Sequence, residues 1–147
     1  MSTSAPPERA RAHGALPAVI VAGLGLLASA YLTVEHYRGA ASLACPETGA
    51  INCVKVTTSR WAEVAGVPVA VLGLAYFVAM TVLVLPPSWR RPELGRARLA
   101  GGTTGALAVV YLVYIELFQV DALCLWCTAV HICVLVLFAL VLARDLA

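Results

Sequence analysis

Four long runs without a charged residue constrain the fold of this chain more than any other feature. They lack Asp, Glu, Lys and Arg, and cover residues 12–34, 64–89, 99–115 and 122–143. A helix needs about 20 apolar residues, with a range of roughly 17 to 25, to cross the hydrocarbon layer of a bilayer. Helices are required there because lipid offers no partner for unpaired backbone groups. We therefore expect an all-α integral membrane protein with a bundle of four transmembrane helices.

The composition supports the same fold class. Of the 147 residues, 61% are hydrophobic and only 12% are charged, whereas about a quarter of the residues in soluble domains are charged. Both a water-soluble globule and a disordered chain are therefore excluded. We expect spans at residues 15–36, 64–86, 99–119 and 122–143, within a membrane domain over 15–147. Residues 1–14 are expected to form a disordered cytoplasmic N-terminus.

The basic residues predict the orientation of the bundle. Seven of the ten would lie on one side: Arg9, Arg11, Arg90, Arg91, Arg96, Arg98 and Arg144. The positive-inside rule then places both termini and the loop at residues 86–98 in the cytoplasm. The loop at residues 38–63 and the turn at residues 116–123 would face outward. The net charge of +2 is thus a topological signal, and no nucleic-acid partner is expected.

Two other interpretations concern the first span. An apolar stretch that follows basic residues and reaches an A-x-A site at residues 28–30 resembles a cleavable signal peptide. An intact N-terminal mass would exclude cleavage. The run GLGLLA from Gly23 imitates a dinucleotide-binding fingerprint, which works only in a strand–turn–helix unit. We predict instead that Gly23, like Gly101 and Gly105, lets helices pack closely.

Four of the five cysteines fall at the expected outer face. Cys45 and Cys53 lie in the outer loop, Cys124 and Cys127 form a C-x-x-C at the outer end of the last span, and Cys133 lies deeper. Disulfides persist in extracytoplasmic compartments. Residues three apart share a helix face, and the start of a helix stabilises a thiolate. The C-x-x-C is therefore predicted to cycle between disulfide and dithiol.

The spacings of His131 and Cys133, together with the loop cysteines, predict an electron relay. His131 lies four residues after Cys127, within roughly 40° of it on a helix, whereas Cys133 is about 120° away and is predicted to be an apolar filler. The outer loop can bring its two sulfurs together or swing one toward Cys124. Two exposed dithiols, one mobile and one fixed at the membrane surface, would pass electrons by thiol–disulfide exchange.

Simpler interpretations of the cysteines remain open. In one alternative, the four cysteines form two structural disulfides that crosslink the outer loop and have no redox role. A four-cysteine metal site is also possible, although a C-x7-C pair lacks the usual zinc-ligand spacing. Covalent haem attachment is excluded because Thr128, not a histidine, follows the C-x-x-C.

At this point the chain resembles the vitamin K epoxide reductase family over roughly residues 16–143. The matching features are the loop-pair spacing of Cys45 and Cys53, the hydroxyl residue Ser59, the G-x-P at residues 66–68 with Gly73, and the C-x-x-C on the last span. Many bacterial members carry a fifth span and a fused thioredoxin-like domain. This chain resembles the short bacterial type, so we expect its partner to be a separate protein.

The resemblance implies a four-helix thiol–quinone oxidoreductase with a short helix between the first two spans. By position, Cys45 would take electrons from an extracytoplasmic thioredoxin-fold (DsbA-like) protein. Cys53 would pass them to Cys124, and Cys127 would be the thiolate nearest the quinone. Ser59 would lie near the quinone pocket or, alternatively, cap the short helix.

Three ionisable residues near the outer end are candidates for proton chemistry. Animal members of the family carry an aromatic hydroxyl residue where this chain has His131, and a histidine there would donate a hydrogen bond or proton to the quinone. The alternative is that His131 bonds a neighbouring helix. Glu116 and Asp121 are predicted to be interfacial acids, with proton relay as the other possibility.

The direction of electron flow follows from redox potentials. A strong disulfide donor needs an acceptor of still higher potential, and a membrane quinone can serve. We therefore expect reoxidation of a secreted disulfide-forming partner, with menaquinone favoured over ubiquinone. Nine arginines against one lysine, with abundant Ala and Gly, are typical of a GC-rich bacterial genome, which favours the disulfide-forming role. We expect the protein to lie in the bacterial inner membrane. The alternatives are a quinone-epoxide reductase that uses the same thiols and a non-enzymatic metal-ion carrier or scaffold.

Overall fold

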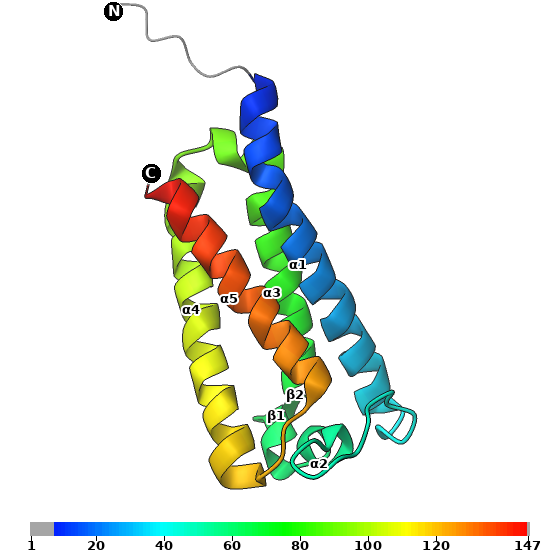
Figure 1. Cartoon of the computed structure of the whole chain (residues 1–147). Coiled ribbons are helices and arrows are strands. Elements are labelled where there is room, and N and C mark those ends of the chain that lie inside the picture. The colour runs from blue at the N-terminus through cyan, green and yellow to red at the C-terminus, as the bar shows by residue number, and fades with distance from the viewer. Residues whose placement is uncertain (1–7, 147) are drawn as a thin grey trace, which may run out of the picture.

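The computed structural model describes residues 8–146, with side chains from Gly14 onward. Its four main helices form a bundle: α1 (Glu8–Tyr37), α3 (Val69–Val84), α4 (Glu93–Ile115) and α5 (Leu125–Asp145). Helix α1 packs against α3 and α5, and α4 packs against α3 and α5 (Figure 1). The predicted fold class, an all-α membrane protein, is confirmed.

Three of the described segments are long and apolar enough to cross a membrane: Gly14–Tyr37, Glu93–Val120 and Leu125–Asp145. Helix α3 has 16 residues and is therefore about 24 Å long, a little short of the ~30 Å hydrocarbon layer. The 3₁₀ helix η2 (Pro86–Arg90) follows it. Large apolar side chains such as Leu27 and Leu107, exposed by 70% and 67%, cover the outside of the bundle, as a lipid-facing surface requires.

Helix α1 begins at Glu8, earlier than the expected span start at residue 15. The expected disordered segment, residues 1–14, therefore ends too late in the sequence, because its last seven residues are helical. The stretch at residues 8–12 contains only Glu, Arg and Ala, which are strong helix formers, so the helix can extend beyond the apolar region. Residues 1–7 of the expected tail lie outside the described residues.

The expected second span also starts too early. Strands β1 (Glu63–Val64) and β2 (Val67–Pro68) pair as an antiparallel hairpin, and α3 begins only after them. Ala65 and Gly66 form the turn with φ of 52° and 80°. Hydropathy alone cannot separate a short apolar strand from a helix, so the charge-free run extends the expected span over residues 64–68.

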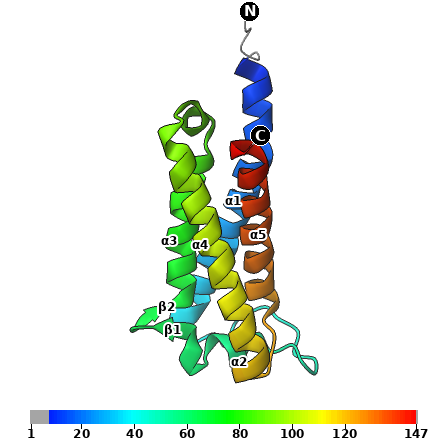
Figure 2. The same ribbon diagram turned by 90° about the vertical axis from the view of Figure 1, so that its left-hand side faces the viewer.

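The elements around the cysteines gather at one end of the bundle. Helix α2 (Cys53–Thr57) and the 3₁₀ helix η1 (Arg60–Ala62) form the expected short helical segment. Helix α4 continues into a π-helical turn, η3 (Glu116–Val120). Figures 1 and 2 show α2 and the hairpin at the end of the bundle opposite to the start of α1 and the end of α5.

Glycines allow α1 and α4 to approach α3 closely. A Cβ at Gly101 or Gly105 would lie 2.7 or 2.5 Å from side chains of α3, and one at Gly25 would overlap the ring of Phe77. The close-packing prediction therefore fits Gly101 and Gly105. It is wrong for Gly23, where an added Cβ would meet nothing within 4 Å, because Gly25 occupies the contact face instead.

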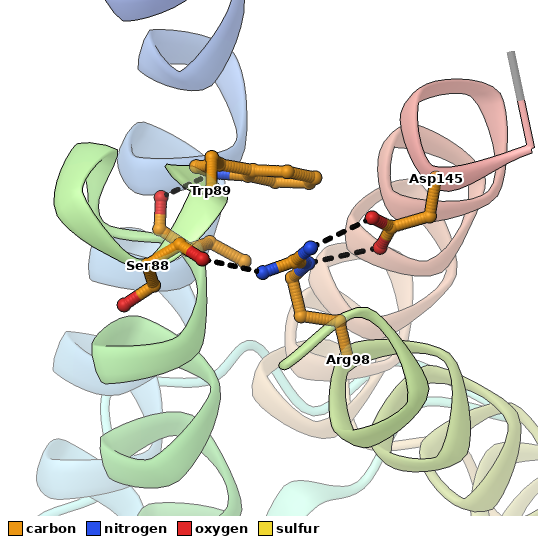
Figure 3. Close-up of polar contacts among 5 residues, drawn as sticks. Ser88, Trp89, Arg98 and Asp145 are labelled. Carbon is orange, nitrogen blue, oxygen red and sulfur yellow. Dashed lines mark hydrogen bonds and ion pairs between the residues drawn. The ribbon is translucent and has the colours of Figure 1, made fainter. Parts of the chain in front are cut away.

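A buried arginine joins the helices at the end opposite to the cysteines (Figure 3). Arg98 is 2% exposed, and its Nε and Nη2 donate to the carboxylate of Asp145 at 2.9 and 2.8 Å. Its Nη1 donates to the Ser88 carbonyl at 3.0 Å. The guanidinium also lies 4.1 Å from the ring centre of Trp89. These contacts connect α4 to α5 and η2.

We expect Arg98→Met to lower the free energy of unfolding by about 3 kcal/mol, because the largely buried Asp145 carboxylate would lose both hydrogen bonds of its ion pair with Arg98. Thermal unfolding of the protein in detergent micelles measures the change. Arg96→Met, at an exposed position on the same helix, is the matched control and should change the free energy by less than about 0.5 kcal/mol. Equal melting temperatures for the two variants would contradict the prediction.

Candidate active site

The outer loop contains a disulfide between Cys45 and Cys53. Of the two possibilities left open by the sequence, the structure shows the one in which the loop sulfurs pair with each other. Cys53 is the first residue of α2, and the side chain of Asn52 caps that helix by accepting the Lys55 N–H at 2.8 Å. Cys53 is fully buried and Cys45 is half-buried. The loop pair is therefore less exposed than predicted.

The C-x-x-C begins helix α5, and both of its cysteines are free thiols. Cys124 is the N-cap, and its sulfur accepts the main-chain N–H of Cys127 at 3.2 Å. Hydrogen bonding from the Cys127 thiol lowers the pKa of the Cys124 thiol, as a redox-active cysteine at a helix start requires. Cys124 is fully buried and Cys127 partly buried, so the prediction of an exposed dithiol is wrong. The outer loop covers it.

The two cysteine pairs lie side by side. Cys53 and Cys124 belong to one cluster of buried side chains, which also includes a leucine of α1 and a leucine of the outer loop. Cys45 and Cys127 pack against the edge of this cluster. All four cysteines that the sequence singled out are thus brought together, in an arrangement that suits thiol–disulfide exchange.

Main-chain hydrogen bonds fasten the outer loop to the segment that precedes α5. The Leu123 N–H donates to the Ala50 carbonyl at 2.8 Å, and the Leu123 carbonyl accepts the Asn52 N–H at 2.9 Å. This pairing keeps residues 122–124 extended, so α5 starts at Leu125 instead of the expected residue 122. It also holds Cys53 beside Cys124, so the predicted free swing of the loop is not what the structure shows.

Trp126, inside the C-x-x-C, adds a side-chain anchor for the segment that precedes Cys45. Its indole N–H donates to the Ala44 carbonyl at 2.8 Å. Its ring centre lies 4.6 Å from that of Tyr31, whose hydroxyl accepts the Ala44 N–H at 2.9 Å. Ala44 is therefore held at both main-chain polar groups, next to the loop cysteine that is more exposed.

We expect Trp126→Phe to speed amide hydrogen exchange in residues 44–52 by about fivefold, because one net hydrogen bond of about 1 kcal/mol no longer opposes local opening. Hydrogen–deuterium exchange with mass spectrometry measures this change. Tyr37→Phe, at a residue that is 71% exposed, is the control and should leave the exchange unaltered. If the two variants exchange alike, the Trp126 anchor does not hold the loop.

A cavity of about 370 Å³ extends from the C-x-x-C into the bundle. Its walls come from all four main helices and from the elements of the outer end, and most of the lining residues are apolar. Cys127 lines the cavity, whereas Cys124 and the loop cysteines do not. An apolar cavity with a few polar groups is the usual form of a small-molecule site.

The other two predicted site residues, Ser59 and His131, also line this cavity. The Ser59 hydroxyl donates to the Val56 carbonyl in the last turn of α2 at 2.9 Å and makes no N-capping bond to η1. Ser59 therefore bonds the C-terminal end of the short helix α2 and also lines the cavity. His131 is 7% exposed, and the described part of the chain provides no side-chain hydrogen bond to it. Cys133 lies outside the cavity lining and packs against the apolar core.

Glu116, which the sequence predicts to be an interfacial acid, is a residue of the site. It is 4% exposed, lines the cavity, and accepts the Cys124 N–H through Oε2 at 3.3 Å. The sequence signal for this role is its position just before the C-x-x-C turn, at the end of a charge-free run. Asp121, by contrast, is exposed in the turn that follows η3. Within residues 14–146, no three His, Cys, Asp or Glu side chains gather as a metal site would require.

Comparison with known families agrees with this geometry. The sequence profile described as "Vitamin K epoxide reductase family" matches residues 16–142, nearly the whole chain. That family consists of membrane oxidoreductases that act on thiols together with quinones. A loop disulfide packed against a C-x-x-C, which in turn borders an apolar cavity, suits such chemistry. The resemblance seen in the sequence is therefore confirmed, and the chain belongs to the vitamin K epoxide reductase family.

Proposed function

We propose that this protein takes electrons from a separate extracytoplasmic thioredoxin-fold protein and reduces a quinone in the cavity, which supports disulfide-bond formation. One observation carries the proposal. Cys127 lines the apolar cavity, while its partner Cys124 packs in the same cluster as Cys53 of the loop disulfide. The C-x-x-C thus contacts the quinone site on one side and the loop pair on the other.

The electrons balance along this path. The two thiols of the partner reduce the Cys45–Cys53 disulfide and become a disulfide themselves. Cys53 then attacks the Cys124–Cys127 disulfide at Cys124, and the loop disulfide forms again as the C-x-x-C becomes a dithiol. That dithiol finally gives two electrons and two protons to the quinone, which becomes a quinol. The structure has the loop disulfide and a reduced C-x-x-C, the combination that precedes quinone reduction.

Burial supports an order for the loop cysteines. Cys53 is fully buried, whereas Cys45 is half-buried. A protein partner can therefore reach the Cys45 sulfur far more readily than the Cys53 sulfur. This difference supports Cys45 as the entry point and Cys53 as the cysteine that passes electrons inward.

Two ionisable residues in the cavity can handle the protons. The Glu116 carboxylate lies beside the main chain of Cys124 and is placed to accept the proton that the Cys124 thiol loses when the C-x-x-C is oxidised. His131 lies on the helix face of Cys127, one turn deeper, and would donate a hydrogen bond to a quinone oxygen. Ser59 would line the same ring site. Such positioned acid–base groups typically contribute about 10²–10⁴-fold to a rate.

The charges support an orientation with both termini in the cytoplasm. The exposed side chains of Arg90, Arg91 and Arg96 lie at the end of the bundle opposite to the cysteines. By the positive-inside rule this end faces the cytoplasm, which puts the cysteines on the oxidising side of a bacterial inner membrane. Menaquinone is the favoured acceptor in this proposal.

Quinone reduction by the purified protein tests the function. The assay mixes the protein with a reduced thioredoxin-fold donor and either a menaquinone or a ubiquinone analogue, and follows quinol formation. We expect repeated turnover to quinol only when both protein and donor are present. If no quinol forms with either quinone, the proposal is wrong.

A further inference from the structure

Two buried hydroxyl groups in the cavity wall have no hydrogen-bond partner among residues 14–146. They are Ser29 Oγ on α1 and Tyr76 OH on α3, and both residues line the cavity. Ser29 is 1% exposed. Buried hydroxyls are almost always hydrogen-bonded, because an unpaired one loses the bonds it makes in water. Two such groups in one cavity therefore indicate a ligand with an oxygen that accepts hydrogen bonds.

Each hydroxyl packs against a glycine of an adjacent helix. A Cβ at Gly73 would lie 3.3 Å from Ser29 Oγ, and a Cβ at Gly105 would lie 2.5 Å from Tyr76 OH. Gly73 and Tyr76 are three residues apart and so share one face of α3. The Tyr76 ring is further held edge-on against Phe77, with ring centres 5.1 Å apart. The two hydroxyls are thus in close packing contact with neighbouring helices and make no hydrogen bond to the described residues.

Counted from the outer end of its own helix, each hydroxyl residue lies further along than the residue that carries the reactive sulfur. At 1.5 Å per residue, Cys127 is about 3 Å from the outer end of α5, whereas Tyr76 is about 10 Å from the outer end of α3. By the same measure Ser29 is about 12 Å from the outer end of α1. A quinone carries two carbonyl oxygens on opposite sides of its ring. One oxygen can therefore lie near Cys127 and His131 while the other points inward.

We propose that Ser29 and Tyr76 donate hydrogen bonds to the inner carbonyl oxygen of the quinone ring. This inference rests on the proposed function and deepens it, because it assigns the second polar end of the site. The pair orients the ring so that its other end faces Cys127. It also favours acceptors with two carbonyl groups across a flat ring over apolar molecules of similar size.

Tyr76→Phe tests the proposal, because it removes a single oxygen and keeps the ring. With menadione as the probe, we expect both the dissociation constant and the KM to rise about five- to tenfold, with kcat within about twofold, as expected for lost ground-state binding. Ser29→Ala should act in the same direction. Without menadione, the melting temperature of Tyr76→Phe should equal or exceed that of the wild type, since an unpaired buried hydroxyl is gone. A purely structural hydroxyl would instead lower the melting temperature and leave menadione binding unchanged.

Thr81→Val is the matched control. Thr81 Oγ1 is also buried on α3 without a hydrogen-bond partner among the described residues, but Thr81 does not line the cavity. Its replacement should leave the KM for menadione unaltered. If the wild type reduces menadione and both Tyr76→Phe and Ser29→Ala keep its KM, the inference is overturned and the proposed function stands. If the wild type neither binds nor reduces menadione or a ubiquinone analogue, the result contradicts both the proposed function and this inference.

Discussion

Replacing Cys127 with serine is expected to abolish quinone reduction, with a rate at least about a thousandfold below that of the wild type. Cys127 is the C-x-x-C cysteine that lines the apolar cavity, so its sulfur is the one that can reach the acceptor. Serine has nearly the same shape but cannot form or release a disulfide. Quinol formation in the presence of a reduced thioredoxin-fold donor measures the loss.

The same variant should still exchange with the donor, because the Cys45–Cys53 disulfide does not depend on Cys127. One round of donor oxidation without quinol formation is the expected pattern. Cys133→Ala is the matched control on the same helix: Cys133 lies outside the cavity lining, and its replacement should keep the rate within about twofold, as for a change away from the reacting groups. Quinone reduction by Cys127→Ser at the wild-type rate would contradict the assignment.

The second large effect is expected at Glu116. Glu116→Gln should lower kcat about a hundredfold, because the amide cannot carry a proton between the C-x-x-C and the quinone. The glutamine oxygen can still accept the Cys124 N–H that now bonds Glu116 Oε2, so the fold and the KM should change little. Steady-state kinetics and the melting temperature together separate the loss of proton transfer from a loss of structure.

Asp121→Asn is the control for Glu116. Asp121 is exposed, and its φ of 53° lies in the left-handed region that asparagine also tolerates. Its replacement removes one carboxylate from the same turn without affecting the cavity, and we expect kcat within about twofold of the wild type. If Glu116→Gln turns over as fast as Asp121→Asn, Glu116 acts only as a hydrogen-bond acceptor for the turn before α5.

The sequence predicts the helical framework well because bilayer physics leaves few choices. Charge-free runs of sufficient length must become helices, and they do so in α1, α4 and α5. The C-x-x-C at the start of α5 can also be predicted from the sequence, because helix geometry and the helix dipole act locally. The failures occur where an apolar sequence has two options: Ala65 and Gly66 turn the chain into a hairpin that hydropathy assigns to a helix.

The polar groups of the cavity could not be predicted in the same way. Hydropathy places Glu116 near the end of a span but does not say whether its carboxyl faces water or the bundle, because the π-helical turn that begins there is a tertiary feature. Ser29 and Tyr76 resemble any other hydroxyl residues in apolar helices. Likewise, the main-chain bonds of Leu123 that hold the loop at the C-x-x-C leave no mark in the side-chain pattern.

A single turnover tests the central claim most directly. The fully reduced protein is mixed with one equivalent of menadione in the absence of donor, and free thiols are then alkylated and mapped by mass spectrometry. We predict one quinol per protein, with the Cys124 and Cys127 thiols protected as a disulfide at the earliest times and the loop cysteines oxidised only afterwards. Quinol formation while Cys124 and Cys127 are still alkylatable at the earliest times, or oxidation of Cys45 and Cys53 before them, would contradict the account.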